Sequence, residues 1–242
     1  MPPRQDYRID DAVFKQFPGY VRGVVLAQNV CNGASPEDLI SILRSTENDL
    51  RNTLSLDTLI KNPPIASWRD AYRSFGSKPS KFRPSVEAMA RRILKGDSLP
   101  SINALVDIGN VISLRYLVPA GGHAIDEVKG DLTLRPAAGD ETFNPFGSDT
   151  TEHPDPGEII FTEGNIVLTR RWTWRQAMHT LTLPETTAIE FNVDGLPPVT
   201  QKHVRTACEE LVKLVGQFCG GDIQTTILTH TNSSLTFTGA VL

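Results

Sequence analysis

Residues Leu99–Asp126 read LPSINALVDIGNVISLRYLVPAGGHAID, and this stretch predicts a helix that ends in a tight turn. Pro100 suits the first turn of a helix, and Ser101 can cap its free N–H groups. Pro119 cannot continue the helix, and the pair Gly121-Gly122 allows positive φ angles, so we expect a sharp turn that presents His123. Apolar residues at helical spacing predict a buried face made of Ile102, Leu105, Val106, Ile112 and Tyr116.

A polar row lies on the same helix. Asn103, Asp107 and Asn110 stand at positions i, i+4 and i+7, so they share one face. One interpretation is structural, with these side chains capping the backbone of a neighbouring loop or Asp107 pairing with an arginine. The other is that the row lines a binding site. The spacing alone leaves both interpretations open.

Outward from this helix, helical patterns dominate the first half of the chain and strand patterns the second half. The first half also holds one apolar, β-branched strand over residues 20–30. The fold class is therefore α+β, with helices packed around a mixed or antiparallel sheet. The expected helices cover residues 35–54, 65–75, 85–95 and 197–218, and the other expected strands lie near 132–134, 158–162, 165–171, 186–193, 224–228 and 234–238.

The composition narrows the class of protein. No run of 18 apolar residues exists, so we expect no membrane span, and the opening MPPRQDYRIDD lacks the apolar core of a signal peptide. Cys31, Cys208 and Cys219 have no CxxC spacing and predict reduced, mostly buried thiols of a cytoplasmic protein. No metal-ligand spacing, P-loop, GxGxxG, HExxH or GxSxG motif is present, so we expect neither a metal nor a cofactor. The oligomeric state stays open.

The charge is distributed unevenly. Between Arg69 and Lys95, eight basic residues stand against Asp70 and Glu87, which gives this segment +6 and the remainder −10 within a net charge of −4. One basic face on an acidic body suits a polyanionic partner. The alternative is a solvated helical face. The eight basic residues are Arg69, Arg73, Lys78, Lys81, Arg83, Arg91, Arg92 and Lys95.

Residues 170–175, RRWTWR, form a second distinctive stretch. On a strand, Arg171, Thr173 and Arg175 would face one way, and Trp172 and Trp174 the other. An arginine fork suits a carboxylate or phosphate, and tryptophan offers a stacking surface. The alternative is a structural arginine, paired with Glu190 or Asp107 over a core filled by tryptophan.

Three motifs in a fixed order resemble the B3/B4 module of the phenylalanyl-tRNA synthetase beta subunit. The family patterns read roughly P-I-S-N-V-V-D-x-T-N-Y-V, then Q-P-L-H-A-F-D, then a strand ending in R-x-A-x-x-G-E. The third match has Asp140 in place of Glu, and the second comes after two extra residues. The matching residues are Asn103, Val106, Asp107 and Asn110, then His123, Ala124 and Asp126, then Arg135, Ala137, Gly139 and Asp140.

The resemblance covers about residues 99–195, and the basic helices before it are similar to those of free-standing versions of the module. It implies a single B3/B4-like domain over residues 1–242, with an N-terminal strand and basic helical part over 1–98 and the core of the module over 99–242. In the synthetase this module is an editing site, which hydrolyses the ester of a wrongly charged amino acid on tRNA. The resemblance therefore implies a trans-acting aminoacyl-tRNA deacylase whose partner is tRNA.

Two departures from the family concern the pocket. Gly109 stands where the family has a threonine, and the segment Thr169–Trp172 replaces the small A-G-V-M-G-G segment. A bulky, charged pocket floor favours a smaller or polar aminoacyl group, or one whose carbonyl or hydroxyl meets an arginine, over the synthetase's own tyrosyl ester.

The resemblance also implies roles for single residues. His123 and Glu190, which matches the pocket glutamate, orient or deprotonate water and hold the α-ammonium group. Asn110 and backbone N–H groups near Gly121-Gly122 stabilise the oxyanion. The expected substrate contacts are Asn103, Asp107, Gly109, Pro119, Gly121, Gly122, Arg170, Arg171 and Trp172, and the expected tRNA contacts are Arg73, Lys78, Lys81, Arg83, Arg91 and Arg92.

Two other functions remain open. One is an RNA-binding module that has kept the fold without turnover. The other is a small-molecule amino-acid binder with no role on RNA, for which charge reversal in the basic segment would leave function intact.

Overall fold

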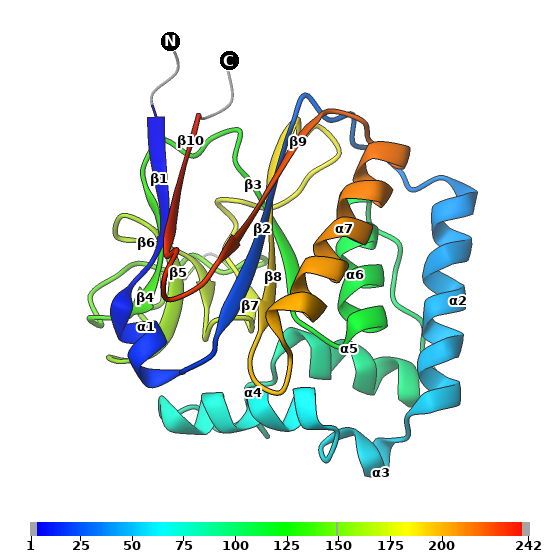
Figure 1. Cartoon of the computed structure of the whole chain (residues 1–242), viewed down its shortest axis with the longest axis horizontal. Coiled ribbons are helices and arrows are strands. Elements are labelled where there is room, and N and C mark those ends of the chain that lie inside the picture. Colours follow the sequence, from blue (N-terminus) through cyan, green and yellow to red (C-terminus); the bar gives the residue numbers. More distant parts are fainter. Residues whose placement is uncertain (1–3, 149, 239–242) are drawn as a thin grey trace.

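The computed structural model describes residues 4–148 and 150–238. They form two β-sheets that pack against each other through an apolar layer, with helices on the outer face of one sheet (Figure 1). The first sheet is mixed, because β1 and β4 run parallel and its other neighbouring strands run antiparallel. Its order is β10 (Ser234–Thr238), β1 (Arg4–Ile9), β4 (Leu132–Pro136), β5 (Ile159–Glu163), β6 (Ile166–Arg170) and β7 (Arg175–Gln176). The second sheet is antiparallel, in the order β3 (Ala120–Ala124), β8 (Ala188–Gly195), β2 (Val21–Gln28) and β9 (Asp222–Leu228).

The predicted α+β class is confirmed, with two sheets in place of the single sheet that the sequence suggested. Most predicted helices lie within a few residues of the observed ones. The exception is the C-terminal helix, expected from Pro197, which begins at Gln201 because the Thr200 side chain accepts from His203 N. The helices are α1 (Asp11–Gln16), α2 (Glu37–Thr53), α3 (Leu56–Leu59), α4 (Pro63–Ser74), α5 (Ser85–Leu94), α6 (Ala104–Tyr116) and α7 (Gln201–Phe218).

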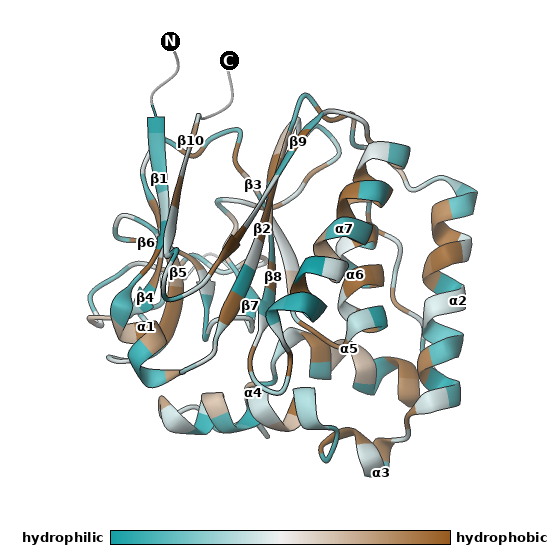
Figure 2. Ribbon diagram, viewed as in Figure 1, coloured by the Kyte–Doolittle hydropathy of each residue, from teal (hydrophilic) through white to brown (hydrophobic). Residues whose placement is uncertain are grey.

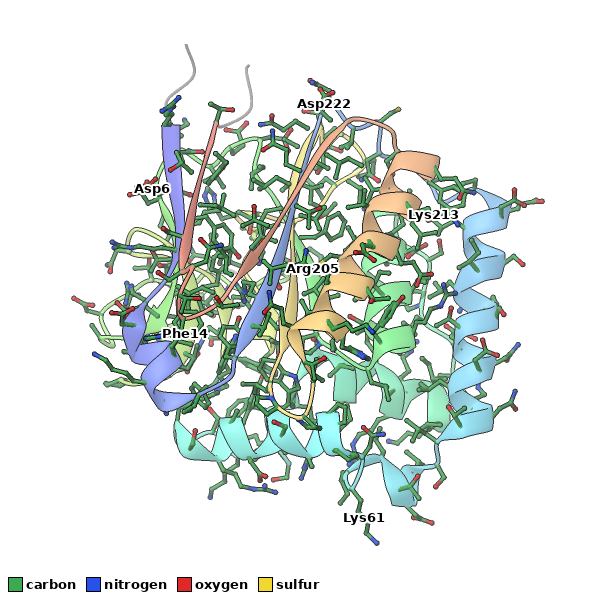
Figure 3. All side chains as sticks on the ribbon, in the orientation of Figure 1. Asp6, Phe14, Lys61, Arg205, Lys213 and Asp222 are labelled. Atoms are coloured by element: carbon green, nitrogen blue, oxygen red, sulfur yellow. The ribbon has the colours of Figure 1, made fainter. Side chains whose placement is uncertain are left out.

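Two apolar layers hold these parts together. One lies between the antiparallel sheet and α6 and α7, with α2 packed beyond α6, and the other fills the space between the two sheets (Figure 3). β2 is covered on both faces, and seven of its eight residues are buried. β1 alternates exposed and buried residues, so only one of its faces meets the core, and it is mostly hydrophilic in Figure 2.

The start of α6 corrects one expectation. Asn103, and not Ser101, is the N-cap, because its Oδ1 accepts from Val106 N at 3.0 Å. The Ser101 hydroxyl donates to Asp107 Oδ2 at 2.5 Å instead, and Ile102, expected in the buried face, is 56 % exposed. Ser35, which opens the helix range predicted over residues 35–54, likewise donates to Asp107 Oδ2, at 2.6 Å, and does not cap α2. The carboxylate of Asp107 therefore draws these two hydroxyls away from helix capping.

In the described part of the chain, Gly121-Gly122 form no turn, although one was expected there. Both glycines lie in β3 and pair with Asn192 and Phe191 of β8. The chain turns earlier, at Leu117, whose φ is +52°. Gly122 is needed for space and not for a positive φ, because a Cβ atom there would lie 2.7 Å from Ile189 Cδ1. A side chain at this point would force the Ile189 side chain to shift and would press on the Phe191 ring.

The strand expected to continue through residues 170–175 ends at Arg170. Arg171 and Trp172 have φ angles of +47° and +64°, so the alternation that we expected for a strand is lost. The cause is Glu158, whose Oε1 accepts from Arg171 N at 2.9 Å and whose two oxygens accept from the Arg170 guanidinium. The chain wraps around this carboxylate and places the Trp172 ring in the space between the sheets.

Candidate functional site

A cavity of about 500 Å³ lies where the edge strand β3 meets the mixed sheet and the helices α5 and α6. Its walls are mainly apolar. The closed end holds side chains that are almost fully buried, whereas the mouth holds large apolar side chains that are exposed. The buried ones are Arg22, His123, Phe161 and Trp172, and the exposed ones are Ile102, Phe146 and Leu183.

The structure brings some of the predicted site residues to this cavity and keeps others away. The predicted residues on its wall are Asn110, Gly109, Pro119, Gly121, Gly122, His123 and Trp172. Those that do not reach the wall are Asn103, Asp107, Arg170, Arg171 and Glu190.

Asn103 and Asp107 hold loops together. The Asn103 amide donates to Thr182 O at 2.9 Å, and Asp107 accepts from Ser35, Ser101 and Ile102 N. Both side chains are buried. These contacts correspond to the structural interpretation of the polar row, while Asn110, one turn further along, faces the cavity.

His123 is fixed at the closed end by hydroxyl groups. Its Nδ1 lies 2.7 Å from Thr180 Oγ1, and its Nε2 lies 3.1 Å from Thr169 Oγ1. Burial lowers the pKa of His123 from 6.5 to about 3, and Arg22 and His179 act in the same direction. The imidazole is therefore neutral near pH 7 and a weak base, and the two hydroxyl groups occupy both of its ring nitrogens.

Glu190 lies next to His123 across the β3–β8 pair but belongs to a buried network behind the cavity wall. It accepts from Tyr7 OH at 2.8 Å and from the Asn192 amide at 3.4 Å. Burial raises the pKa of Glu190 from 4.5 to about 7, against the opposing effects of Arg22 and Tyr7. Asn192 lines the cavity and thus separates this carboxyl group from it.

An ion pair that the sequence analysis missed lies at the closed end. Arg22 of β2 donates to both oxygens of Asp194 of β8, through Nε at 2.7 Å and Nη2 at 2.8 Å, and the side chains are 1 % and 0 % exposed. Part of the signal lay in the sequence, because Arg22 is the single charged residue in YVRGVVLAQNV, whereas Asp194 shares its strand with Glu190. A buried charge needs a partner of opposite sign.

Arg170 and Arg171 are structural, and neither pairs with Glu190 or Asp107. Arg170 makes an ion pair with Glu158, and Arg171 stacks between Phe82 and Trp174, with its guanidinium carbon 3.7 Å and 4.6 Å from the ring centroids. The arginine that lines the closed end of the cavity is Arg22 instead.

The basic segment lies beside the cavity but is partly neutralised. Arg69 and Arg91 make ion pairs with the buried Glu87, and Arg73 pairs with Asp70. The loop 76–84 carries exposed cations and adjoins the cavity through Phe82, whose ring lies 4.9 Å from that of Trp174. Within the described ranges, no carboxylate pairs with its basic residues Lys78, Lys81 and Arg83, and Arg92 on α5 donates to Ser98 O.

The described residues contain neither a metal site nor a membrane-spanning helix. No group of three or more His, Cys, Asp and Glu side chains is placed to hold a metal ion. No helix in this part of the chain is long and apolar enough to cross a bilayer.

Comparisons with known proteins place the chain in context. A family model described as the B3/4 domain matches residues 67–220. Among solved structures, an N-terminal fragment of the phenylalanyl-tRNA synthetase beta-subunit from Pyrococcus horikoshii is similar, with a TM-score of 0.46 and 13 % identity over 90 % of this chain. The chain spans about half of that fragment, 49 % of its length. No curated protein matches the chain.

Proposed function

The chain belongs to the B3/4 domain family, since the family model covers more than half of its residues, and we propose that it hydrolyses the ester bond of a mischarged aminoacyl-tRNA. One observation carries the proposal: Asn110, His123 and the outer edge of β3 face a single cavity, and exposed cations adjoin it. The editing role implied by the motif resemblance supplies the reaction. A tRNA substrate implies action in the cytoplasm.

We also propose that residues 1–242 act as one domain. β1 pairs with β4 and β10, and β2 pairs with β8 and β9, so N-terminal strands lie inside both sheets. The N-terminal strands also supply Tyr7 and Arg22 to the region behind and within the cavity.

The oxyanion donors come from α6 and β3. Residues of an antiparallel edge strand alternate between facing their partner and facing outward. Ala120 N donates to Ser113 Oγ and Ala124 N to Thr180 O, both away from β8, so Gly122 N between them also points outward. Within the described residues this N–H has no acceptor, and Gly122 lines the cavity. Gly122 N–H and the Asn110 amide would therefore stabilise the oxyanion.

In this reaction a water oxygen bonds to the ester carbonyl carbon, the bond from that carbon to the ribose oxygen breaks, and the ribose oxygen takes the proton that the water loses. Both ring nitrogens of His123 already have hydroxyl partners, so His123 would hold the Thr169 hydroxyl, which lines the cavity, in place to position the water. With a pKa of about 3, His123 is too weak a base to deprotonate this water. The ester is already activated, so positioning and oxyanion donors supply most of the catalysis.

His123→Ala is expected to lower the rate constant of deacylation by about 10- to 100-fold, because misplacing the water by about 1 Å costs a factor of this size. The measurement is release of amino acid from each mischarged tRNA in turn, at saturating enzyme. His203→Ala provides a matched control, because His203 lies on α7, which does not line the cavity. Equal rates for wild type and His123→Ala would show that His123 has no part in the mechanism. Equal rates for wild type and Glu190→Ala would show the same for Glu190.

A second function, tRNA binding without turnover, is favoured by a specific observation. The imidazole of His123 has a pKa of about 3, and Glu190, the carboxyl group with a pKa near 7 among the described residues, stands behind the cavity wall. This alternative predicts that wild type binds tRNA but hydrolyses no ester, and that His123→Ala leaves the binding unchanged.

Reversing two charges on the loop 76–84, Lys81→Glu with Arg83→Glu, is expected to weaken tRNA binding about tenfold or more at 0.1 M salt. Each phosphate contact that is lost should reduce the slope of log K against log salt by about 0.7 to 0.9. Filter binding or fluorescence anisotropy over a salt series measures both effects. The control is Lys202→Glu with Lys213→Glu on α7, which makes the same change in net charge away from the cavity (Figure 3). If both double variants bind alike, the loop is not the tRNA contact.

A further inference from the structure

The closed end of the cavity holds a polar centre that has no role in the hydrolysis described above. The inference drawn from this centre rests on the proposed function, because it concerns the specificity of the same site. Arg22 and Asp194 form a buried ion pair there, and Arg22 lies on the cavity wall. Arg22 belongs to β2, which precedes the residues matched by the family model. The N-terminal part of the chain therefore supplies the floor of the site.

Arg22 keeps hydrogen-bond donors for a ligand. A guanidinium group has five N–H bonds. Nε and one N–H of Nη2 are directed to Asp194, and one N–H of Nη1 donates to Tyr7 OH at 2.8 Å. One N–H on Nη1 and one on Nη2 thus remain, and no acceptor for them occurs among the residues that the structure describes. The guanidinium carbon lies 5.2 Å from the centroid of Phe161, another residue of the wall, which fixes the plane of the group.

The charge around Arg22 selects the class of ligand group. Asp194 neutralises Arg22, so the pair offers donors without a net positive charge to attract a carboxylate. The carboxyl group of Glu190, bonded to the same Tyr7 hydroxyl, further opposes an anion. A ligand ammonium has only N–H donors and so offers no acceptor to the remaining N–H bonds of Arg22. This centre can bind an uncharged oxygen acceptor, such as a hydroxyl or carboxamide group, without leaving a buried charge unpaired.

The walls between this centre and the mouth are apolar and include Leu105, Val106 and Leu181. We propose that Arg22 determines specificity by donating to an uncharged oxygen at the end of the aminoacyl side chain. The site therefore selects a hydroxyl- or carboxamide-bearing aminoacyl group over its apolar isostere. A site built to hydrogen-bond such a group rejects the analogue that lacks it, since its own donors are then left unpaired.

The test compares isosteric ligands that cannot be hydrolysed. The probes are 3′-amido-3′-deoxyadenosines that carry threonyl or valyl, and asparaginyl or leucyl, with binding measured by calorimetry. Wild type is expected to bind the polar member of each pair about 10- to 100-fold more tightly. Arg22→Met combined with Asp194→Leu removes both charges together, which avoids an uncompensated buried ion, and should reduce each ratio to about one.

The control is Arg115→Met with Glu210→Leu, a partly exposed ion pair between α6 and α7 outside the cavity, which should keep the wild-type ratios. Thermal melting shows that each variant is folded before binding is compared. Ratios near one in wild type, or unchanged ratios in the Arg22 double variant, would overturn the role of Arg22 and leave the proposed hydrolysis standing. Polar selectivity without any deacylation would overturn hydrolysis and leave Arg22 in place, whereas failure of wild type to bind any probe would overturn both.

Discussion

Asp194→Asn is expected to lower the free energy of unfolding by about 3–5 kcal/mol, because it leaves the positive charge of Arg22 buried without a counter-ion. Arg22 is 1 % exposed and meets solvent only through the closed end of the cavity, so little water screens its charge. Asp194 also accepts from Tyr20 OH, so the same change weakens a second buried contact. Urea unfolding at pH 7, followed by tryptophan fluorescence, measures the effect.

The matched control is Asp70→Asn, which removes the charge of an aspartate that also pairs with an arginine, but at the surface. Asp70 pairs with Arg73, and the two side chains are 73 % and 55 % exposed. The loss there should be below about 1 kcal/mol, because exposed ion pairs are screened by solvent. Similar losses of unfolding free energy in the two variants would show that the buried ion pair stabilises the protein no more than the exposed one. A loss in Asp194→Asn that disappears on adding Arg22→Met would identify the uncompensated charge as its cause.

Glu190→Gln is expected to stabilise the protein at pH 8 by about 3 kcal/mol relative to wild type, and to have little effect at pH 4. Burial raises the pKa of Glu190 to about 7 in the folded state, against about 4.5 in the unfolded chain. The folded state therefore holds this proton more tightly. Stability from this group is complete below pH 4.5, falls as the pH rises to about 7, and is then constant. Glutamine imitates the protonated form at every pH and keeps an acceptor for Tyr7 OH.

The measurement is the difference in unfolding free energy between wild type and Glu190→Gln from pH 4 to pH 8. Taking the difference cancels the groups that both proteins share, including His123. That histidine acts in the opposite sense, because its lowered pKa makes the folded state lose stability as the pH falls from 6.5 toward 3. Glu163→Gln, at a carboxylate whose pKa is lowered by hydrogen bonds from His179, Lys129 N and Gly130 N, should show no gain at pH 8. If the difference in unfolding free energy between wild type and Glu190→Gln does not change with pH, the buried carboxyl group does not titrate near neutrality.

Several features of this protein could be predicted from local sequence pattern. The helices over residues 37–53, 63–74, 85–94 and 104–116 follow from apolar spacing, and the hairpin of β5 and β6 follows from strand residues on either side of Glu163-Gly164. The motifs carrying Asn110 and His123 identified the helix and the strand that line the cavity. The prediction failed where a single distant side chain redirects the chain. Glu158 turns residues 171 and 172 into left-handed conformations that no period-2 pattern shows.

The sequence by itself determined the class of fold, the family motifs and the positions of most helices, because each depends on residues that are close along the chain. Only the tertiary structure decided which charges meet. Arg22 and Asp194 are 172 positions apart, and Tyr7 and Glu190 are 183 apart. The physical reason is that strand order and register bring β1, β2 and β8 together, and a single buried charge indicates that a partner exists without identifying it. That arrangement placed Arg22 at the closed end of the cavity and kept Glu190 behind its wall.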